Sequence, residues 1–272
     1  MAKTLVSILI PCFNARSFLS QTLRSALNQS WENKEIIVAD DGSTDGSLEV
    51  AKRFECNCVR VISTGHLGAC RARNIAFEAS RGEYIQWLDA DDVLHPDKIR
   101  LQIEAIRKSN LGDSVLLTGP FGTFFYRTRN ARFSPSALWQ DLLPADWILE
   151  KFRTYTWMNP AAWLLSRTLA ESAGPWDETL SRDQDGEYIC RVVSRAHFVK
   201  FVPDAISLYR VANNASISKT HSRKACESIW RSTKLCIGYL LDLEDSPRTR
   251  LACIQYLELC GGVGRGICSI RN

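Results

Sequence analysis

The chain has 272 residues, of which 45% are hydrophobic and 24% are charged, and its formal net charge is +4. A chain of this length can bury the core of one large domain, and its composition is that of a globular protein. The small net charge, without a long run of Lys or Arg, argues against a nucleic-acid-binding protein. The apolar runs are strand-sized, so we expect no membrane span.

The ten cysteines do not form a pattern typical of disulfides or of a zinc site. Cys56 and Cys58 are close neighbours, but no second pair follows them at zinc-site spacing. The first residues lead directly into an apolar run, so we expect no signal peptide. We therefore expect reduced thiols that pack as small hydrophobic groups, in a cytoplasmic protein.

Strand-like and helix-like patterns alternate over the first third of the chain. Nearly continuous apolar runs suit strands that are buried on both faces, and apolar residues at helical spacing separate these runs. The β-α-β-α-β-α-β order predicts a mostly parallel sheet with helices on both faces. The predicted strands are residues 5–10, 35–39, 59–62 and 84–88, and the predicted helices are residues 18–27, 47–54 and 69–79.

Further elements are predicted from residue 97 to the C-terminus. Residues 119–159 are less regular and rich in aromatic side chains, and we expect a partly extended, partly helical flap over a ligand-binding crevice. Any single tryptophan of this segment is more often part of a hydrophobic core. The fold is predicted to end at residue 215, and residues 216–272 are predicted to form a helical C-terminal extension. The other predicted strands are residues 115–118, 161–165, 198–202 and 205–209, and the other predicted helices of the main domain are residues 97–108, 168–173 and one that starts near residue 184.

Polar residues gather where three of the early strands end, at residues 11–14, 40–41 and 89–92. Open α/β sheets bind ligands at this edge, so we expect the three clusters to converge on one crevice. Asp89, Asp91 and Asp92 repel one another unless a cation lies among them, and their hard oxygen atoms suit Mg²⁺ or Mn²⁺. Taken alone, this acidic cluster is equally compatible with a solvated turn that has no function.

Four motifs in order make the sequence similar to a known family. They are residues 6–14 (VSILIPCFN), 39–45 (ADDGSTD), 72–74 (ARN) and 88–92 (LDADD). Residues 4–210 resemble family-2 glycosyltransferases, which have the GT-A fold, a Rossmann-like mostly parallel sheet flanked by helices. The resemblance implies transfer of a sugar, with inversion at its anomeric carbon, from a nucleotide-diphospho sugar. A UDP-sugar is the expected donor, and the expected acceptor is a hydroxyl of a glycan or of a lipid-linked glycan.

The resemblance assigns the residues after the first two strands to the nucleotide. Pro11, Phe13 and Asn14 stand where the family binds the base and the ribose, and the ring of Phe13 suits stacking on a base. Asp41 resembles the carboxylate that accepts a hydrogen bond from the base. Asp40 stands beside it and is expected near the ribose.

The resemblance assigns the acidic cluster to the diphosphate and its metal ion. Asp89, Ala90 and Asp91 match the DxD motif, in which Asp91 would hold Mn²⁺ or Mg²⁺ and Asp89 would act through the ribose or a water molecule. Asp92 is expected to support them. His221 is a further candidate ligand for the metal or the phosphates, although a lone histidine is more often a surface or packing residue.

Arg73 and Asn74 match the family's Ala-Arg-Asn motif and are assigned to donor binding. Arg73 either approaches the diphosphate or pairs with the acidic cluster. Aromatic side chains suit the apolar faces of sugars, so Trp157 and Trp176, with Asn159 between them, are candidates for the acceptor site. The same residues are equally suited to a hydrophobic core.

The family's general base lies at the start of a late helix, where this chain has Asp185. Gln184 stands where an acidic residue is more usual, whereas Arg191 follows six residues after Asp185 as in the family pattern. Asp183 is a competing candidate for the base, although capping of the helix is its more ordinary role. Glu187 is a poorer candidate.

Two other functions share the predicted acidic site. A nucleotidyltransferase that makes nucleotide sugars needs a glycine-rich basic loop after the first strand, whereas this chain has Pro11 to Ala15 at that position. A catalytically inactive nucleotide-sugar-binding protein is disfavoured by the intact DxD motif and by Asp185. For the transferase, we expect peripheral contact with the inner face of the membrane, where lipid-linked acceptors lie.

Overall fold

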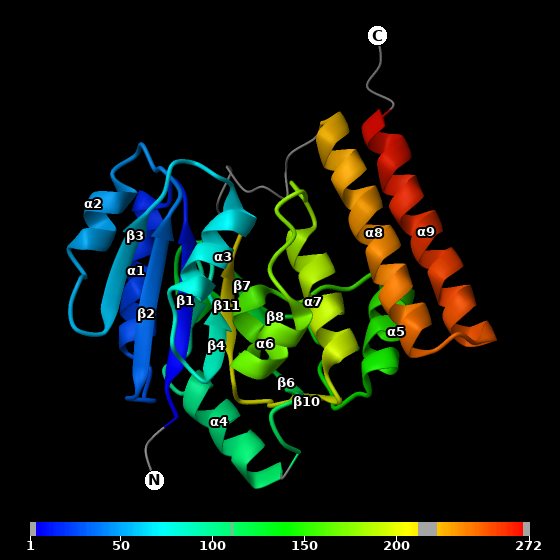
Figure 1. Ribbon diagram of the computed structural model, residues 1–272, viewed down its shortest axis with the longest axis horizontal. Helices are drawn as coiled ribbons and strands as arrows, with labels where there is room; N and C mark the ends of the chain where they lie inside the picture. Colours follow the sequence, from blue (N-terminus) through cyan, green and yellow to red (C-terminus); the bar gives the residue numbers. More distant parts are fainter. Residues whose placement is uncertain (1–3, 110, 212–221, 269–272) are drawn as a thin grey trace.

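The computed structural model describes residues 4–109, 111–211 and 222–268. Within these ranges, the main sheet has parallel pairing throughout except at β9, which is antiparallel to both of its neighbours. The predicted mostly parallel sheet is thus confirmed. Its strand order is β10 (Phe198–Phe201), β6 (Val115–Thr118), β9 (Leu164–Ser166), β4 (Tyr84–Trp87), β1 (Val6–Cys12), β2 (Lys34–Asp40) and β3 (Val59–Ser63) (Figure 1).

Helices cover both faces of this sheet. Successive residues of a strand point to opposite faces, so a strand whose residues are all apolar has two faces to bury. Ile8 and Ile10 join one hydrophobic cluster, and Leu9 joins the other. The first cluster packs under α1 (Arg16–Leu27), α2 (Ser47–Lys52) and α4 (Lys98–Ser109). The second cluster packs under α3 (Ala69–Glu78), α5 (Pro144–Thr154), α6 (Arg167–Ala173) and α7 (Gln184–Arg195).

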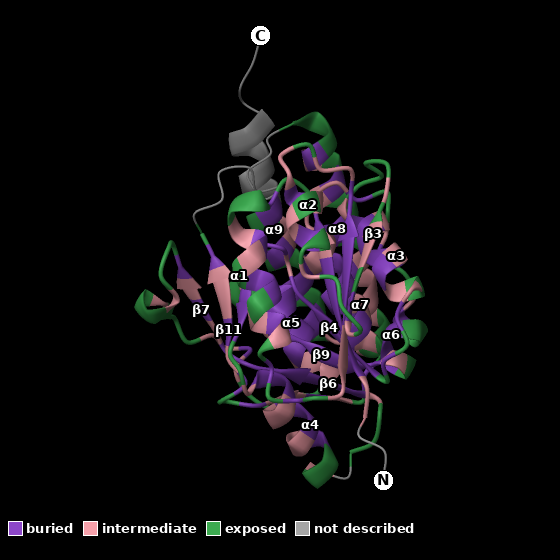
Figure 2. Ribbon diagram, turned by 90° about the vertical axis from the view of Figure 1, so that its left-hand side faces the viewer, coloured by how far each residue is buried: buried purple, intermediate pink, exposed green. Residues whose placement is uncertain are grey.

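A second, smaller sheet has the order β5 (Val93–Leu94), β11 (Ser207–Arg210), β7 (Phe121–Phe124) and β8 (Arg132–Phe133). The hairpin between β7 and β8 projects from the body of the molecule, and its tip is exposed (Figure 2). Residues 198–202 and 205–209, which were predicted as two successive strands, are strands of different sheets. Apolar periodicity predicts a strand but not the sheet that the strand joins.

The prediction of one flap over residues 119–159 is wrong for α5. Trp147 and Phe152 on this helix are fully buried, and Phe152 stacks on Tyr256 at 4.1 Å between ring centroids. The aromatic residues of α5 therefore belong to the core. The strand predicted over residues 161–165 begins only at Leu164, because Pro160–Ala162 forms a 3₁₀ turn.

The predicted C-terminal extension is helical in its described part, as α8 (Arg223–Leu243) and α9 (Pro247–Cys268), which lie side by side (Figure 1). Cys236, Leu240 and Tyr256 join the hydrophobic cluster under α5 and α7. The predicted boundary at residues 215 and 216 lies outside the described residues. None of the described helices is both long enough and apolar enough to cross a lipid bilayer.

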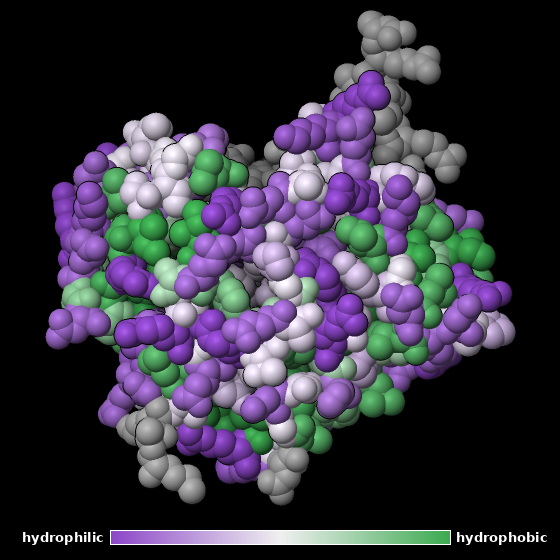
Figure 3. All heavy atoms as spheres, viewed as in Figure 1, coloured by the Kyte–Doolittle hydropathy of each residue, from purple (hydrophilic) through white to green (hydrophobic). Residues whose placement is uncertain are grey.

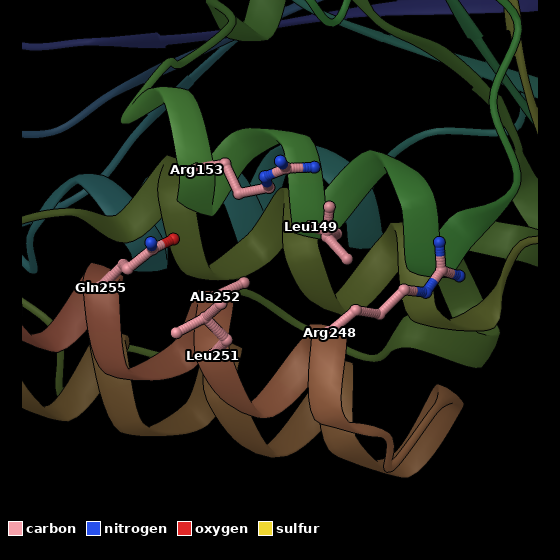
Figure 4. A pocket seen from close by; sticks show the side chains of 6 residues that line it. All are labelled: Leu149, Arg153, Arg248, Leu251, Ala252 and Gln255. Atoms are coloured by element: carbon pink, nitrogen blue, oxygen red, sulfur yellow. The ribbon is translucent and has the colours of Figure 1, made fainter.

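A groove of about 180 Å³ lies between α5 and α9 (Figure 4). Its apolar wall is made by Leu149, Leu251 and Ala252, while Arg153 and Arg248 border it. None of the residues that the sequence assigns to a site lines this groove. The groove between α5 and α9 is therefore separate from the predicted site.

Candidate active site

The three polar clusters of the sequence lie together at the edge of the main sheet where β1, β2 and β4 end. Cys12 pairs with Asp40 across β1 and β2, and Leu9 pairs with Trp87 across β1 and β4. Figure 1 shows this edge at the top of the sheet, and Figure 3 shows a notch in the surface there, between the lobe that carries α2 and the upper part of α8. The predicted convergence of the clusters agrees with this strand register.

Arg73 on α3 connects the end of β4 to the start of α7. Its Nη2 donates a hydrogen bond to Oδ1 of Asp89 at 2.9 Å, and its Nη1 donates to Oε1 of Gln184 at 3.2 Å. The guanidinium also lies 4.4 Å from the centroid of the Trp176 ring. Since only 8% of Arg73 is exposed, its charge is little screened by water. The sequence left two roles open for Arg73, contact with the diphosphate or pairing with the acidic cluster. In the structure, Arg73 pairs with Asp89 of the acidic cluster.

Asp185 lies in the first turn of α7, close enough to this pair for their charges to interact. The pKa of its carboxyl is raised to about 6, chiefly because burial disfavours the charged form. The nearby carboxylates of Asp183 and Asp89 also raise this pKa, whereas Arg73 lowers it. A partly buried carboxylate with a pKa near neutrality suits a group that accepts a proton.

Asp183 does not cap α7 with its side chain, so the predicted capping role is wrong. It has a left-handed backbone conformation with φ at 57°, and its Oδ2 accepts a hydrogen bond from Oγ of Ser232 at 2.6 Å. Burial raises the pKa of Asp183, while Lys151 and the bond from Ser232 lower it. The carboxylate is thus engaged by α8 rather than by the helix that it precedes.

Glu187 is bound on both oxygens and is poorly placed to act as a base. Arg191 donates to its Oε1 at 2.7 Å and to its Oε2 at 2.9 Å, and the hydroxyl of Tyr239 also donates to Oε1 at 2.7 Å. Only 1% of Glu187 is exposed. Arg191, which matches the family pattern, therefore forms a buried ion pair with Glu187 within α7.

Asp92 is fully buried and supports the acidic cluster from behind. Its Oδ2 accepts from Nδ2 of Asn159 at 2.5 Å, and its Oδ1 accepts from the backbone nitrogen of Arg210 at 2.9 Å. Burial raises the pKa of Asp92 well above its usual value, and repulsion by Asp91 and Asp89 adds to this. Asn159 is therefore a partner of the cluster rather than a wall of an acceptor site.

Asp89 and Asp91 are the carboxylates of the cluster that remain partly accessible, and the side chain of Asp89 is 29% exposed. Within the described residues, no group of three or more His, Cys, Asp or Glu side chains has the arrangement of a metal site. Asp89 and Asp91 offer hard carboxylate oxygens, which would suit a Mg²⁺ or Mn²⁺ ion. His221, the third predicted ligand, lies outside the described residues.

The ring of Phe13 is available at the predicted base site, because 47% of the residue is exposed. It lies 4.5 Å from the ring of His66, with an angle of 31° between the two planes. His66 has a positive φ of 57° and was not predicted as a site residue. The glycines on either side of residues 66–67, directly after the third strand, were the signal that a functional loop lies there.

The two aspartates at the end of β2 accept most of their hydrogen bonds from neighbouring loops. Asp41 accepts from the backbone nitrogens of Leu67 at 2.6 Å and Gly68 at 2.9 Å, and only 3% of it is exposed. Asp40 accepts from the nitrogen of Ser43 through Oδ2, while its buried Oδ1 has no hydrogen-bond partner among the described residues. Asn14 accepts from the nitrogen of Thr44 and so holds the same loop. In this arrangement, both carboxylate oxygens of Asp41 accept hydrogen bonds from the protein itself, at the position that the sequence assigned to the base.

The remaining predicted residues differ in how far they reach the crevice. Pro11 is partly buried within β1, and Ala90 is 8% exposed. Asn74 bonds to both backbone groups of Trp176 at 2.8 and 3.0 Å, so its amide holds the loop at residue 176. Trp176 itself is only 2% exposed, whereas Trp157 is 43% exposed. Of the three candidates for an acceptor wall, Trp157 alone has a substantial exposed surface.

Comparison with known proteins identifies the class of this fold and site. The structure superposes on the Staphylococcus aureus protein TarS, crystallised in complex with UDP, with a TM-score of 0.72. The match covers 93% of this chain and 70% of the TarS chain at 17% identity, and it establishes a GT-A fold. The family model for glycosyl transferase family 2 matches residues 7–163, which is more than half of the chain. The chain therefore belongs to glycosyl transferase family 2.

Two relatives match 38% of the chain at higher identity. The putative teichuronic acid biosynthesis glycosyltransferase TuaG of Bacillus subtilis is 39% identical over 105 residues, which are 38% of this chain and 42% of TuaG. Chondroitin synthase of Escherichia coli is 41% identical over 106 residues, which are 38% of this chain and 16% of the synthase. The chain thus aligns with less than half the length of either relative.

We expect the substitution Asp183→Asn to lower the pKa of Asp185, because it removes a negative charge that raises this pKa. The amide oxygen of the new side chain still accepts the hydrogen bond from Ser232, so the backbone should keep its position. A ¹³C NMR titration of the carboxyl groups measures the pKa directly. The control is Asp245→Asn, at an exposed residue paired with Arg250. An unchanged pKa of Asp185 in the Asp183→Asn protein would contradict the proposed electrostatic environment.

Proposed function

We propose that this protein is an inverting glycosyltransferase that uses a UDP-sugar and a divalent cation, with Asp185 as the general base. The observation that carries this proposal is the placement of Asp185, whose pKa is about 6, beside the Arg73–Asp89 pair at the carboxyl edge of the sheet. A proton acceptor and the candidate diphosphate site thus lie on one side of the molecule. Family membership supports glycosyl transfer as the reaction.

In the proposed reaction, Asp185 accepts the proton of an acceptor hydroxyl while the oxygen of that hydroxyl attacks the anomeric carbon. The bond from this carbon to the nucleoside diphosphate breaks on the opposite side, which inverts the configuration. Asp89 and Asp91 would hold Mn²⁺ or Mg²⁺, whose charge stabilises the departing diphosphate. Asp185 is mostly ionised at neutral pH and is basic enough to take the proton as it is released.

A uridine nucleotide is proposed for the donor. TarS has been crystallised with UDP and with UDP-GlcNAc, and this chain shares its fold. The exposed ring of Phe13 offers a face on which a base can stack. The buried Oδ1 of Asp40, which lacks a partner among the described residues, is an acceptor that a ribose hydroxyl would satisfy after a small local movement.

A growing glycan or a lipid-linked glycan is proposed as the acceptor, in polysaccharide biosynthesis. The names of TuaG and of chondroitin synthase refer to the synthesis of polysaccharides. The exposed indole of Trp157, which packs against Phe121 and Tyr209, is the proposed sugar-binding surface. Burial raises the pKa of the Tyr209 hydroxyl, and the nearby charges of Asp92 and Asp91 raise it further, so this residue lies near the acidic cluster.

We also propose that the hairpin between β7 and β8 contacts an anionic membrane surface. Phe125 and Tyr126 at its tip are 61% and 80% exposed. The exposed Arg127, Arg129 and Arg132 follow them, and residues 114–140 contain no acidic residue. Exposed aromatic rings with several arginines suit the interface of an anionic bilayer. Arg210 bonds to the carbonyls of Phe125 and Asp91, so this contact would hold the crevice near lipid-linked acceptors.

The substitution Asp185→Asn should lower kcat by about 10²- to 10⁴-fold, which is the usual contribution of a general base. Binding of UDP, measured by calorimetry, should stay nearly unchanged. In the wild-type protein, kcat/KM should fall below about pH 6, because Asp185 of the free enzyme is then protonated. Release of the nucleoside diphosphate from each member of a panel of UDP-, GDP- and dTDP-sugars measures turnover and identifies the donor. Turnover of Asp185→Asn near the wild-type level would assign the base to another residue.

The substitution Asp91→Ala should abolish the effect of Mn²⁺ on UDP binding, because it removes a proposed ligand of the cation. In a thermal-shift assay with UDP, added Mn²⁺ should raise the Tm of the wild-type protein but not that of the variant. Asp242→Ala, at an exposed residue on α8, is the control. An equal Mn²⁺ response in wild type and Asp91→Ala would show that the cation binds elsewhere.

Replacing Arg127, Arg129 and Arg132 with Gln should weaken binding to vesicles that contain phosphatidylglycerol by about a hundredfold, since each basic residue contributes about 1 kcal/mol. Co-sedimentation with these vesicles and with pure phosphatidylcholine vesicles measures the effect. Trp230→Ser with Lys234→Gln removes an exposed aromatic–basic pair on α8 and serves as the control. Equal binding of the wild-type protein to both kinds of vesicle, or to neither, would contradict the proposed contact.

A further inference from the structure

Four side chains on one face of α8 contact the short segment that carries Asp185. Ser228, Ser232, Cys236 and Tyr239 follow one another at intervals of three or four residues, so they lie in a row along the helix. Each of them makes a polar contact with residues 181–187. The row extends along the segment from before Asp185 to beyond it.

Ser228 holds the backbone just before α7. Its Oγ accepts hydrogen bonds from the nitrogens of Ser181 at 3.0 Å and Arg182 at 2.9 Å, and it donates to the carbonyl of Arg182 at 2.7 Å. Ser228 is 5% exposed. Two backbone N–H groups thus have a side chain of α8 as their partner, and removal of that partner would leave them poorly satisfied.

Ser232 holds the residue two positions before Asp185. It is fully buried, and its Oγ donates to Oδ2 of Asp183 at 2.6 Å. Asp183 is in the left-handed region, which is unfavourable for a non-glycine residue, so its contacts have to offset that cost. Gly186 leaves room for this carboxylate, since a Cβ atom at that position would lie 2.2 Å from Oδ1 of Asp183.

Cys236 and Tyr239 complete the row beyond Asp185. Sγ of Cys236 lies 3.6 Å from the carbonyl oxygen of Gly186, and the hydroxyl of Tyr239 donates to Oε1 of Glu187 at 2.7 Å. Asp185 is therefore bracketed by residues that are bonded to α8 on both sides. Among the described residues, no hydrogen bond joins the side chain of Asp185 to α8, so α8 acts on this side chain through the segment that carries it.

We propose that α8 positions the proton acceptor: Ser228 and Ser232 fix the backbone of residues 181–183 and, through it, the direction of the Asp185 side chain. Both serines are positioning residues, because they act through other residues. The inference rests on the proposed role of Asp185. A displacement of about 1 Å at a reacting group can lower a rate by about a hundredfold, so small changes at this contact should be visible in turnover.

The test is the substitution Ser232→Ala. We expect kcat to fall by about 10- to 100-fold while KM for the donor and the affinity for UDP stay within about twofold. In the wild-type protein, the hydrogen bond from Ser232 lowers the pKa of Asp183. Without this bond the pKa of Asp183 should rise, so Asp183 should be protonated more often and should repel Asp185 less. The acidic limb of the kcat/KM profile should therefore move to lower pH. Hydrogen exchange should show faster exchange of the amides at residues 181–187.

Thr233→Val is the matched control. Thr233 is the neighbouring residue on α8, is fully buried, and donates its hydroxyl to the carbonyl of Ile229 within the helix. Its substitution removes a buried hydroxyl without touching residues 181–187, so kcat and the pH profile should stay at wild-type values. Equal losses of kcat in Ser232→Ala and Thr233→Val would overturn the inference.

A second variant and a second readout separate the possible failures. If Ser232→Ala does not fold, Tyr239→Phe removes one bond of the row at a partly exposed residue, and kcat should fall a few-fold. If Ser232→Ala shows faster exchange at residues 181–187 but keeps the wild-type kcat, the positioning role of α8 is wrong, while the proposed role of Asp185 is unaffected. Wild-type turnover of Asp185→Asn would instead overturn the proposed function on which the inference rests.

Discussion

The two sides of the crevice are joined by a buried cation, the guanidinium of Arg73. It lies between Asp89, which follows β4, and Gln184, which begins α7 and is 111 residues away in the sequence. Its positive charge also acts on Asp185. Removal of one partner of a buried ion pair commonly costs 3–5 kcal/mol, because it leaves the other charge uncompensated. Without Arg73, carboxylates from two distant segments would repel one another at close range.

Two residues that the sequence assigned to ligand binding, Asn74 and Trp176, instead hold the guanidinium of Arg73 in place. Trp176 places its ring against the guanidinium of Arg73, and Asn74 fixes the backbone of Trp176 through two hydrogen bonds. The Ala-Arg-Asn motif thus has a structural explanation in which the arginine bridges the acids and the asparagine fixes the ring that covers it. A motif predicts that its residues are needed together, but it does not distinguish contact with a ligand from contact within the protein.

Local patterns predicted the parts of the fold that depend on neighbours in the chain. Apolar runs predicted the early strands, and the carboxyl-edge rule predicted that Asp40 and Asp89 lie at the same edge. The role of Asp183 was missed because its partner, Ser232, lies on a helix 49 residues later, which no local pattern relates to it. The place of the whole helix α5 in the core was not predicted for the same reason, since Tyr256 and other distant residues cover its aromatic face.

The acidic residues of this edge separate into two groups by the donors that reach them. Asp41, Asp92 and Glu187 are buried and accept hydrogen bonds on both oxygens from the protein itself. Asp89 and Asp185 are partly accessible, and Asp185 has a pKa near neutrality. Environments that differ in this way assign different tasks to identical side chains. The first group builds the crevice, and the second remains available for chemistry.

The family model ends at residue 163, so Asp185 and α8 lie beyond the matched segment, whereas the proposed nucleotide and metal residues up to Asp91 lie within it. The two halves of the proposed reaction are therefore held by different parts of the chain. The proposed stacking on Phe13 and the proposed metal binding at Asp89 and Asp91 would depend on loops after β1 and β4. The proposed direction of the Asp185 side chain would depend on α8, a helix that packs from outside the main sheet. A change in the four α8 residues that contact the segment carrying Asp185 is therefore expected to alter transfer while nucleotide binding is preserved, because their polar contacts are made with residues 181–187.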